Sequence, residues 1–207
     1  MSRHPLLVVG TANRKKGLEL TELVAPLGLE LRTLADYPTA IAVVESGDTF
    51  AANAALKASE QARHLGHWVL ADDSGLAVDA LGGRPGVFSA RYAGEAATDE
   101  ENNRRLLADL ADVPLERRTA HYVCHATLAE PTGAIRAEAE DYCHGRILFA
   151  DEGSGGFGYD PLFEIVDYHR TFGQLSPAVK ACLSHRARAM RKLLPIFQHL
   201  LATGQWV

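Results

Sequence analysis

Short apolar runs of strand type alternate with segments of helical periodicity along this chain, and this alternation limits the fold more than any other feature. The first pair is an apolar run at 5–11 followed by apolar side chains at helical spacing within 13–28. A second pair consists of a strand at 29–34 and a helix at 49–66. A polypeptide that repeats such pairs is expected to place helices against a sheet.

The rest of the chain continues this pattern. The later segments are predicted as strands at 67–73 and 75–81, a loop rich in Gly and Pro at 82–97, a helix at 98–111, an antiparallel hairpin at 118–147 and a largely helical end at 176–202. Helices mixed with both consecutive and crossover strands predict an α/β protein with a mixed sheet. We expect a single domain over residues 1–207.

Composition limits the partners and the cellular compartment. The chain has 207 residues, 47% of them hydrophobic, and a formal net charge of −5. This charge argues against binding of a nucleic acid polymer and favours a small anionic partner. No apolar run is long enough to cross a membrane, and the first residues lack the pattern of a secretory signal, so we expect a cytoplasmic protein without a membrane partner. The three cysteines are widely spaced, which predicts reduced thiols rather than disulfides or a zinc site.

Two adjacent carboxylates, Asp72 and Asp73, follow the apolar run at 67–71. In an extended strand they point to opposite faces, so both can line one site only if the strand ends there, and Gly75 would allow such an end. The alternative is that the segment is an ordinary turn, since Asp, Ser and Gly favour turns. Glu45 also follows an apolar stretch and could bring a third carboxylate to the same place, although alone it could be a solvated loop residue. Carboxylates that converge in this way suit Mg²⁺ bound together with substrate phosphates.

The start of the first predicted helix is a candidate anion site. Backbone N–H groups are free at a helix N-terminus, and Lys16 on the first turn could add a positive charge. The segment is neither a P-loop nor a dinucleotide-binding fingerprint. The alternative is a helix start capped by Asn13 with a solvated basic edge, and Lys57 in the second helix could likewise be only exposed.

The loop at 153–160 places Phe157 and Tyr159 among glycines, an arrangement that can bring backbone and an aromatic face close to a flat ligand. The alternative is a tight turn into the following strand.

Further along, Lys180 and His185 would point about 140° apart on one continuous helix. A break at Ser184 would instead begin a new helix with His185 at its N-terminus.

Five motifs in this order carry a resemblance to a known family. They are T-A-N-R-K-K at 11–16, E-S-G-D-T-F at 45–50, A-D-D-S-G-L at 71–76, G-G-F-G-Y-D-P at 155–161 and S-H-R at 184–186. Together they resemble the Ham1/inosine triphosphate pyrophosphatase family, in its bacterial dITP/XTP pyrophosphatase branch. The resemblance implies an elongated mixed β-sheet flanked by helices, with two lobes around a central nucleotide-binding cleft, usually in a homodimer. It also implies Mg²⁺-dependent hydrolysis of ITP, dITP and XTP to the monophosphate and pyrophosphate.

The resemblance also implies roles for single residues. Asp73 would be the proton acceptor and, with Glu45, a metal ligand, and Asp72 would support it. The substrate-binding residues would be Thr11, Asn13, Lys16 and Lys57 near the phosphates, Ser74 on the nucleotide, Phe157, Gly158, Tyr159 and Asp160 at the base, and Lys180, His185 and Arg186 at the base edge. The chain departs from its relatives at Gln174, Ala178 and Val179, where they tend to carry acidic residues.

Donors from His185 or Arg186 would pair with the 6-oxo group of inosine or xanthine and would clash with the amino group of adenine. Guanine also carries a 6-oxo group, so its rejection must come from near C2.

Two other functions remain open: a Maf-type pyrophosphatase for other modified nucleotides, and a nucleotide-binding sensor without turnover. The carboxylates argue against the sensor, because negatively charged residues would repel a bound polyanion unless a cation lies between them.

Overall fold

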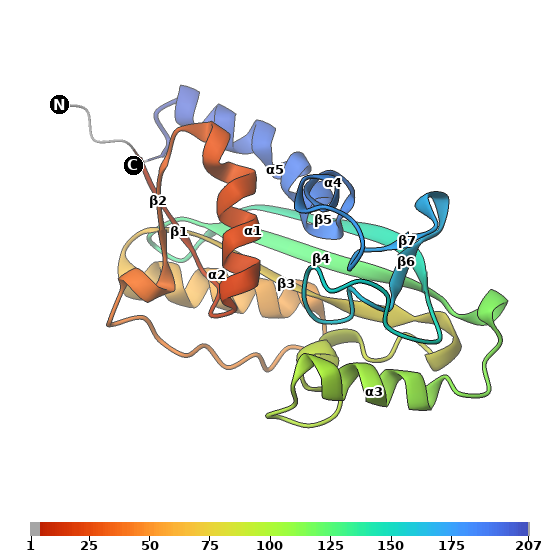
Figure 1. The fold of residues 1–207 in the computed structure, drawn as a ribbon. Coiled ribbons are helices and arrows are strands. Elements are labelled where there is room, and N and C mark those ends of the chain that lie inside the picture. The colour runs from red at the N-terminus through yellow and green to blue at the C-terminus, as the bar shows by residue number, and fades with distance from the viewer. Residues whose placement is uncertain (1–4, 207) are drawn as a thin grey trace. The chain divides into compact units, whose positions relative to one another are not determined.

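A computed structural model describes residues 5–206, whose strands form one mixed sheet (Figure 1). The strands are β1 (Leu6–Val9), β2 (Glu30–Thr33), β3 (Trp68–Val78), β4 (Thr119–Ala129), β5 (Ile135–Ile147), β6 (Phe163–Ile165) and β7 (Arg170–Thr171). Their order in the sheet is β2-β1-β3-β4-β5-β6-β7. β1 pairs parallel with β2 and β3, whereas β6 pairs antiparallel with β5 and β7. The predicted mixed α/β sheet is confirmed.

The helices are α1 (Arg14–Val24), α2 (Phe50–Leu65), α3 (Asp99–Asp109), α4 (Pro177–Leu183) and α5 (His185–Ala202). The predicted caps are present: the Thr49 hydroxyl accepts from the backbone N–H of Ala52 at the start of α2, and Gly66 ends that helix in the left-handed conformation. The predicted break at Ser184 is also confirmed, because Ser184 is extended and separates α4 from α5.

The strand carrying the two aspartates continues past them. β3 runs without interruption from Trp68 to Val78, so the expectation that a strand ends near Gly75 is wrong, as is the alternative of a turn. Leu70 and Ala71 before the aspartates and Leu76 and Val78 after them are buried, and the burial of these apolar side chains favours the extended backbone through this segment. Neighbours β4 and β5 are joined by residues 130–134, too short a link for a parallel crossover, which confirms the predicted antiparallel hairpin.

The chain divides into two compact units. Unit 1 contains the described residues up to Asp73, together with Cys124–Asp141 and those from Arg186 onward. Unit 2 contains Ser74–Val123 and Tyr142–His185. Strands β3, β4 and β5 each contribute to both units. The predicted single domain with two lobes around a cleft stays a prediction.

In unit 1, alternate residues of the strands face different helices. Leu7 and Leu70 belong to a buried cluster with side chains of α1 and α5, whereas Val8, Val69 and Ala71 belong to a second cluster with alanines of α2. This follows from the two-residue period of a strand. Each face of this part of the sheet is therefore covered by a helix, and polar groups on β3 must find their partners there.

Unit 2 has its own core. Leu76 and Val78 of β3 pack in one buried cluster with Leu106 of α3 and with Leu110, the residue that follows this helix. The same cluster includes Tyr122, Phe163 and Phe172, whose rings contact one another, and also Tyr159.

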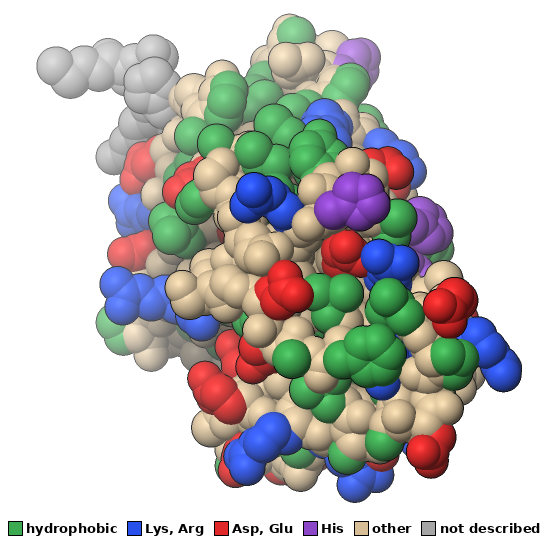
Figure 2. Space-filling model, turned by 45° about the vertical axis from the view of Figure 1, so that its right-hand side comes forward, with side chains coloured by type: hydrophobic (Ala, Val, Ile, Leu, Met, Phe, Trp, Pro, Cys, Tyr) green, Lys and Arg blue, Asp and Glu red, His purple; other side chains and the backbone are tan. Residues whose placement is uncertain are grey.

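Within residues 5–206, no helix has both the length and the apolar character needed to cross a lipid bilayer. The face drawn in Figure 2 carries Lys, Arg, Asp and Glu side chains interspersed with one another. A mixed surface of this kind agrees with the modest net charge of −5. The cytoplasmic location and the homodimer stay predictions.

Candidate active site

The two aspartates of β3 serve different faces of the strand, as their alternation requires. Asp72 contacts Arg186 of α5, on the face of the strand that α1 and α5 cover. Asp73 contacts Lys57 of α2, on the opposite face. Both carboxylates are buried, with 0% of Asp72 and 6% of Asp73 exposed. One strand thus presents two adjacent carboxylates to two separate sets of partners in unit 1.

Asp73 is held by two side chains of α2. Lys57 Nζ donates to Asp73 Oδ1 at 2.9 Å, and Asn53 Nδ2 donates to Oδ2 at 3.3 Å. The two residues are four apart on the helix and therefore lie on one face. Glu45 joins this group, since its Oε2 lies 3.5 Å from the same Lys57 ammonium. The structure thus brings together three predicted residues, Glu45, Lys57 and Asp73.

Asn53 was not identified from the sequence, and it connects the segment after Glu45 to Asp73. Its Oδ1 accepts from the backbone N–H of Gly47 at 2.8 Å, which leaves its amide NH₂ facing Asp73. A Cβ on Gly47 would lie 2.6 Å from Ala52 Cβ and 2.8 Å from Asn53 Oδ1, so only glycine allows this approach. The helical spacing of Asn53 and Lys57 is the signal that could have identified it.

Asp72 takes part in a second, more deeply buried group. Arg186 Nε and Nη2 both donate to Asp72 Oδ2 at 3.1 Å, and Arg186 Nη1 donates to Glu19 of α1. Burial alone lowers the pKa of Arg186, but attraction to Asp72 and Glu19 outweighs it and the net shift is upward. The guanidinium therefore stays charged. Sequence reasoning assigned Arg186 to the base edge and missed Glu19; that assignment of Arg186 stays a prediction.

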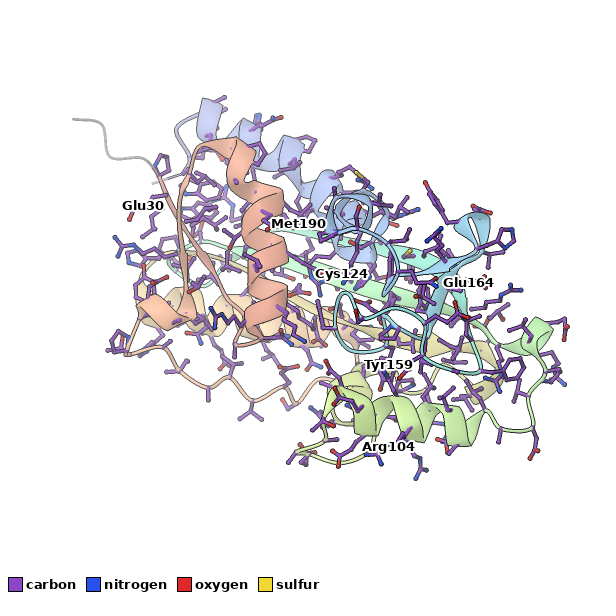
Figure 3. All side chains as sticks on the ribbon, in the orientation of Figure 1. Glu30, Arg104, Cys124, Tyr159, Glu164 and Met190 are labelled. Atoms are coloured by element: carbon purple, nitrogen blue, oxygen red, sulfur yellow. The ribbon has the colours of Figure 1, made fainter. Side chains whose placement is uncertain are left out.

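Cys124 of β4, which is labelled in Figure 3, lies beside this pair, with its Sγ 3.8 Å from Asp72 Oδ2. Burial raises the pKa of the Cys124 thiol, and the neighbouring Asp72 raises it further against the opposing effects of Arg186 and Lys16. The predicted reduced, buried thiol is confirmed for Cys124 and Cys143, whereas Cys182 is exposed.

The start of α1 is capped as the simpler interpretation predicted. Asn13 Oδ1 accepts from the backbone N–H groups of Lys15 and Lys16, and the backbone N–H of Asn13 donates to Thr11 Oγ1. Thr11 and Asn13 thus fix the local turn of the chain, and Lys16 lies on the first turn of the helix. Phosphate binding by these residues stays a prediction.

The donor set around Asp73 fits a hard cation. Glu45 and Asp73 offer carboxylate oxygens. The Lys57 ammonium lies 3.5 Å from Glu45 Oε2 and 2.9 Å from Asp73 Oδ1, so the two carboxylates together bind a positive charge. Among the residues described, no group of three or more His, Cys, Asp and Glu side chains could hold a metal ion. Two carboxylates are nevertheless the usual protein share of a Mg²⁺ site that substrate phosphates complete.

The glycine-rich loop of unit 2 is organised around Asp160. Its carboxylate accepts from the backbone N–H of Phe157 at 2.8 Å and from Lys180 Nζ at 2.6 Å, both on Oδ2. Tyr122 Oη lies 3.5 Å from the other oxygen. Gly156 is left-handed, with φ of 75°, and a Cβ there would collide with the Asp160 carboxylate. Residues 158–162 form hydrogen-bonded turns that lead directly into β6, so the alternative of a tight turn is also present, with its conformation fixed around Asp160.

Predicted base-binding residues gather around this loop within unit 2. Lys180 Nζ lies 4.4 Å from the centroid of the Phe157 ring, and His185 stacks on Tyr122 at 4.7 Å between centroids. Because Tyr122 also approaches Asp160, it connects His185 to the loop. Lys180 and His185 are 8% and 5% exposed, so both side chains are fixed by packing. Sequence reasoning missed Tyr122, which the alternating pattern of its strand does not distinguish from a core residue.

Gly158 and Tyr159 are held from outside the loop. The backbone N–H of Gly158 donates to Asp99 Oδ2 at 2.9 Å, and its carbonyl accepts from Asn103 Nδ2 at 3.2 Å, so α3 binds both sides of this residue. Tyr159 is labelled in Figure 3; its ring is 4% exposed, and its hydroxyl donates to the carbonyl of Ser89 at 2.8 Å. These contacts make Tyr159 a support of the loop, and its predicted contact with the base stays a prediction.

Ser74 is half-buried on β3 and belongs to unit 2, one residue after Asp73 of unit 1. His185 of unit 2 likewise precedes Arg186 of unit 1. The predicted residues thus fall into two groups, one in each unit: carboxylates with their cations in unit 1, and the glycine-rich loop with Lys180 and His185 in unit 2.

Known proteins match nearly the whole chain. The family model described as the Ham1 family matches residues 7–196. A dITP/XTP pyrophosphatase of Rhodopirellula baltica is 53% identical over 99% of this chain and 98% of its own length. A dITP/XTP pyrophosphatase of Geobacillus kaustophilus is 49% identical over 90% of this chain and 91% of its own length.

Solved structures give the same result for the fold. A HAM1 protein from Coxiella burnetii is 34% identical, with a TM-score of 0.85 over 94% of this chain and 98% of that chain. A nucleoside-triphosphatase / dITP/XTP pyrophosphatase from Mycobacterium abscessus is 43% identical, with a TM-score of 0.74 over 92% of this chain and 99% of that chain.

Proposed function

The chain belongs to the Ham1 family, and on that basis we propose that it hydrolyses the non-standard purine nucleoside triphosphates ITP, dITP and XTP to the monophosphate and pyrophosphate. The relatives named dITP/XTP pyrophosphatase support this activity, at about half the residues identical over nearly the whole chain. The observation that carries the proposal is that the carboxylates of Glu45 and Asp73 both contact one cation, the Lys57 ammonium. Carboxylates that lie beside a polyanionic substrate need a cation between them and the substrate.

We assign the metal to Glu45 and Asp73, with Mg²⁺ as the ion their oxygens suit. Bound there, Mg²⁺ would neutralise phosphate charge and orient the triphosphate. Asn53 holds Asp73 and the segment after Glu45 in place, which fixes the separation of the two carboxylates before substrate arrives.

Asp73 is the proton acceptor of this reaction. Water adds to the α-phosphorus, its proton passes to the Asp73 carboxylate, and the bond from the α-phosphorus to the bridging oxygen breaks as pyrophosphate leaves. Thr11, Asn13 and Lys16 bind phosphates near the start of α1, where the positive end of the helix dipole favours anions. Asp72 supports Asp73 indirectly: its ion pair with Arg186 fixes the position of β3, on which Asp73 is the next residue.

The residues of unit 2 recognise the base. Phe157 offers a ring for stacking, and Lys180 and His185 offer donors for a 6-oxo group, which inosine and xanthine carry and adenine lacks. Ser74, Gly158, Tyr159 and Asp160 shape the same site through the backbone of the strand and loop. A protein in this role acts on the nucleotide pool of the cytoplasm, and we expect a homodimer.

A panel assay tests the proposal. The purified protein is incubated with ITP, dITP, XTP, the standard triphosphates and modified pyrimidine triphosphates in the presence of Mg²⁺, and pyrophosphate is measured separately from orthophosphate. We expect pyrophosphate release from ITP, dITP and XTP and little from ATP. Preference for pyrimidine derivatives would support a Maf-type enzyme, and binding without any release would support a sensor.

A further inference from the structure

The Lys57 ammonium occupies the place between two carboxylates that a metal ion would use. Its Nζ lies 2.9 Å from Asp73 Oδ1 and 3.5 Å from Glu45 Oε2. The side chains of Lys57 and Asp73 are only 12% and 8% exposed, so this is not a solvated surface pair. The sequence suggested only an exposed lysine or a phosphate contact for this residue.

The charges in this group explain why the ammonium is held there. Asp73 is buried, and a buried carboxylate without a cation would be unfavourable, whereas Glu45 is exposed and joins the group from its edge. Asn53 binds the second oxygen of Asp73 and carries no charge, so among the contacts described for Asp73 the positive charge comes from Lys57. The Lys57 ammonium, 2.9 Å from Asp73 Oδ1 and 3.5 Å from Glu45 Oε2, is therefore the counter-ion of these carboxylates in the protein without metal.

A divalent cation bound by the same oxygens would repel this ammonium strongly across a distance of a few ångströms. We propose that metal binding is an exchange, and this proposal rests on the function proposed above. The Lys57 ammonium leaves Asp73 and Glu45 when a divalent cation binds there, and the ammonium then binds the triphosphate. Lys57 thus acts as a resident counter-ion that prevents repulsion between the carboxylates while the site holds no metal.

This exchange couples the metal to the nucleotide. Without nucleotide, the displaced ammonium has lost its carboxylate partners, so a divalent cation must bind weakly. With a triphosphate present, the ammonium gains phosphate oxygens, and each ligand must then strengthen the binding of the other by the same factor. The protein would therefore take up its metal together with its substrate.

The test is a calorimetric titration of Mn²⁺ into the metal-free protein without nucleotide. Lys57→Gln removes the competing charge, and we expect its Kd for Mn²⁺ to fall about tenfold or more below that of the wild type, within the range of coupled binding events. Lys57→Arg keeps the charge and should bind Mn²⁺ no more tightly than the wild type does. Lys192→Gln is the matched control, because Lys192 pairs with Asp141 at the surface of the same unit, and its Kd should stay within about twofold of the wild-type value.

The unfolding temperature is a second readout. Metal-free Lys57→Gln should unfold below the wild type, because its carboxylates lack a cation, and Mn²⁺ should raise its unfolding temperature more than that of the wild type. A Kd for Lys57→Gln equal to or weaker than the wild-type value overturns the exchange. If the variant does not fold without metal, a crystal structure of the wild type with Mn²⁺ decides: Lys57 Nζ still bonded to Asp73 Oδ1 overturns the proposal, and Nζ displaced from it supports the proposal.

These results are independent of turnover. A wild type that releases pyrophosphate, with an unchanged Kd in Lys57→Gln, overturns the exchange and leaves the proposed function in place. A wild type that hydrolyses no triphosphate, with a tighter Kd in Lys57→Gln, overturns the proposed function and leaves the exchange.

Discussion

In unit 1 the carboxylates of Asp72 and Asp73 are held by cationic side chains from helices, whereas in unit 2 the loop around Phe157 is held largely through its own backbone. Asp160 and Asp99 accept backbone N–H groups of that loop, and glycine makes the necessary close approach possible. Unit 1 therefore depends on charge balance, and unit 2 depends on backbone shape. Substitutions that change charge should affect unit 1 most, and those that add volume should affect unit 2 most.

The largest effect is expected for Asp73→Asn. The amide keeps the size of the carboxylate and can still accept from Lys57, but it cannot take up a proton, so we expect kcat for ITP to fall about 10²- to 10⁴-fold. Pyrophosphate release measures kcat, and circular dichroism during heating checks the fold. Asp79→Asn is the control, because Asp79 is exposed in unit 2 and its carboxylate accepts from the Thr119 hydroxyl at 2.6 Å, an interaction that the amide oxygen can keep. A kcat near the wild-type value in Asp73→Asn would contradict our choice of proton acceptor.

Arg186→Met should be the most destabilising change in unit 1. It leaves the fully buried Asp72 without its cation, and the free energy of unfolding should fall by about 3–5 kcal/mol. Lys192→Met, which breaks the surface pair with Asp141, should cost only about 0–1 kcal/mol. Urea denaturation measures both losses.

The double variant Asp72→Asn/Arg186→Met separates the charge from the packing. Removing both charges should restore part of the stability lost in Arg186→Met, because the unpaired buried carboxylate is then gone. A double variant less stable than Arg186→Met would mean that the ion pair is not the main contribution of Arg186.

Local rules predicted the parts of the site that depend on neighbours in sequence. The opposite directions of Asp72 and Asp73 follow from strand alternation, and the helix start at His185 follows from the capping preference of Ser184. Asn13 caps α1 for the same reason. In each case a few adjacent residues determine the conformation.

Partners distant in sequence could not be predicted in this way. Glu19 and Arg186 are 167 residues apart, and no local pattern marks either as a buried ion pair rather than a solvated charge. The wrong expectation for β3 has the same origin: Gly75 permits a strand end, but burial of Leu76 and Val78 in the core of unit 2 keeps the chain extended. Tertiary packing here outweighs the local tendency of glycine to end a strand.

Gly156→Ala tests the dependence of unit 2 on backbone shape. The left-handed backbone disfavours alanine, and its Cβ would also displace the Asp160 carboxylate, so we expect a loss of about 1–3 kcal/mol in unfolding free energy and a rise in KM for ITP of about tenfold. Gly204→Ala in unit 1 is the matched control, since φ is 68° there and a Cβ would meet no atom within 4 Å. Its KM should not change. Equal effects of the two substitutions would show that backbone strain, and not Asp160, is responsible.

The smallest effect is expected for Tyr159→Phe, which distinguishes support of the loop from contact with the base. The substitution removes the hydrogen bond to the Ser89 carbonyl and keeps the ring, so the free energy of unfolding should fall by about 1 kcal/mol, with KM for ITP and XTP almost unchanged. Tyr168→Phe provides the comparison, because Tyr168 is 50% exposed in the same unit and should lose little stability. A clear rise in KM without loss of stability would instead place the Tyr159 hydroxyl at the base, and shape alone would then no longer account for binding in unit 2.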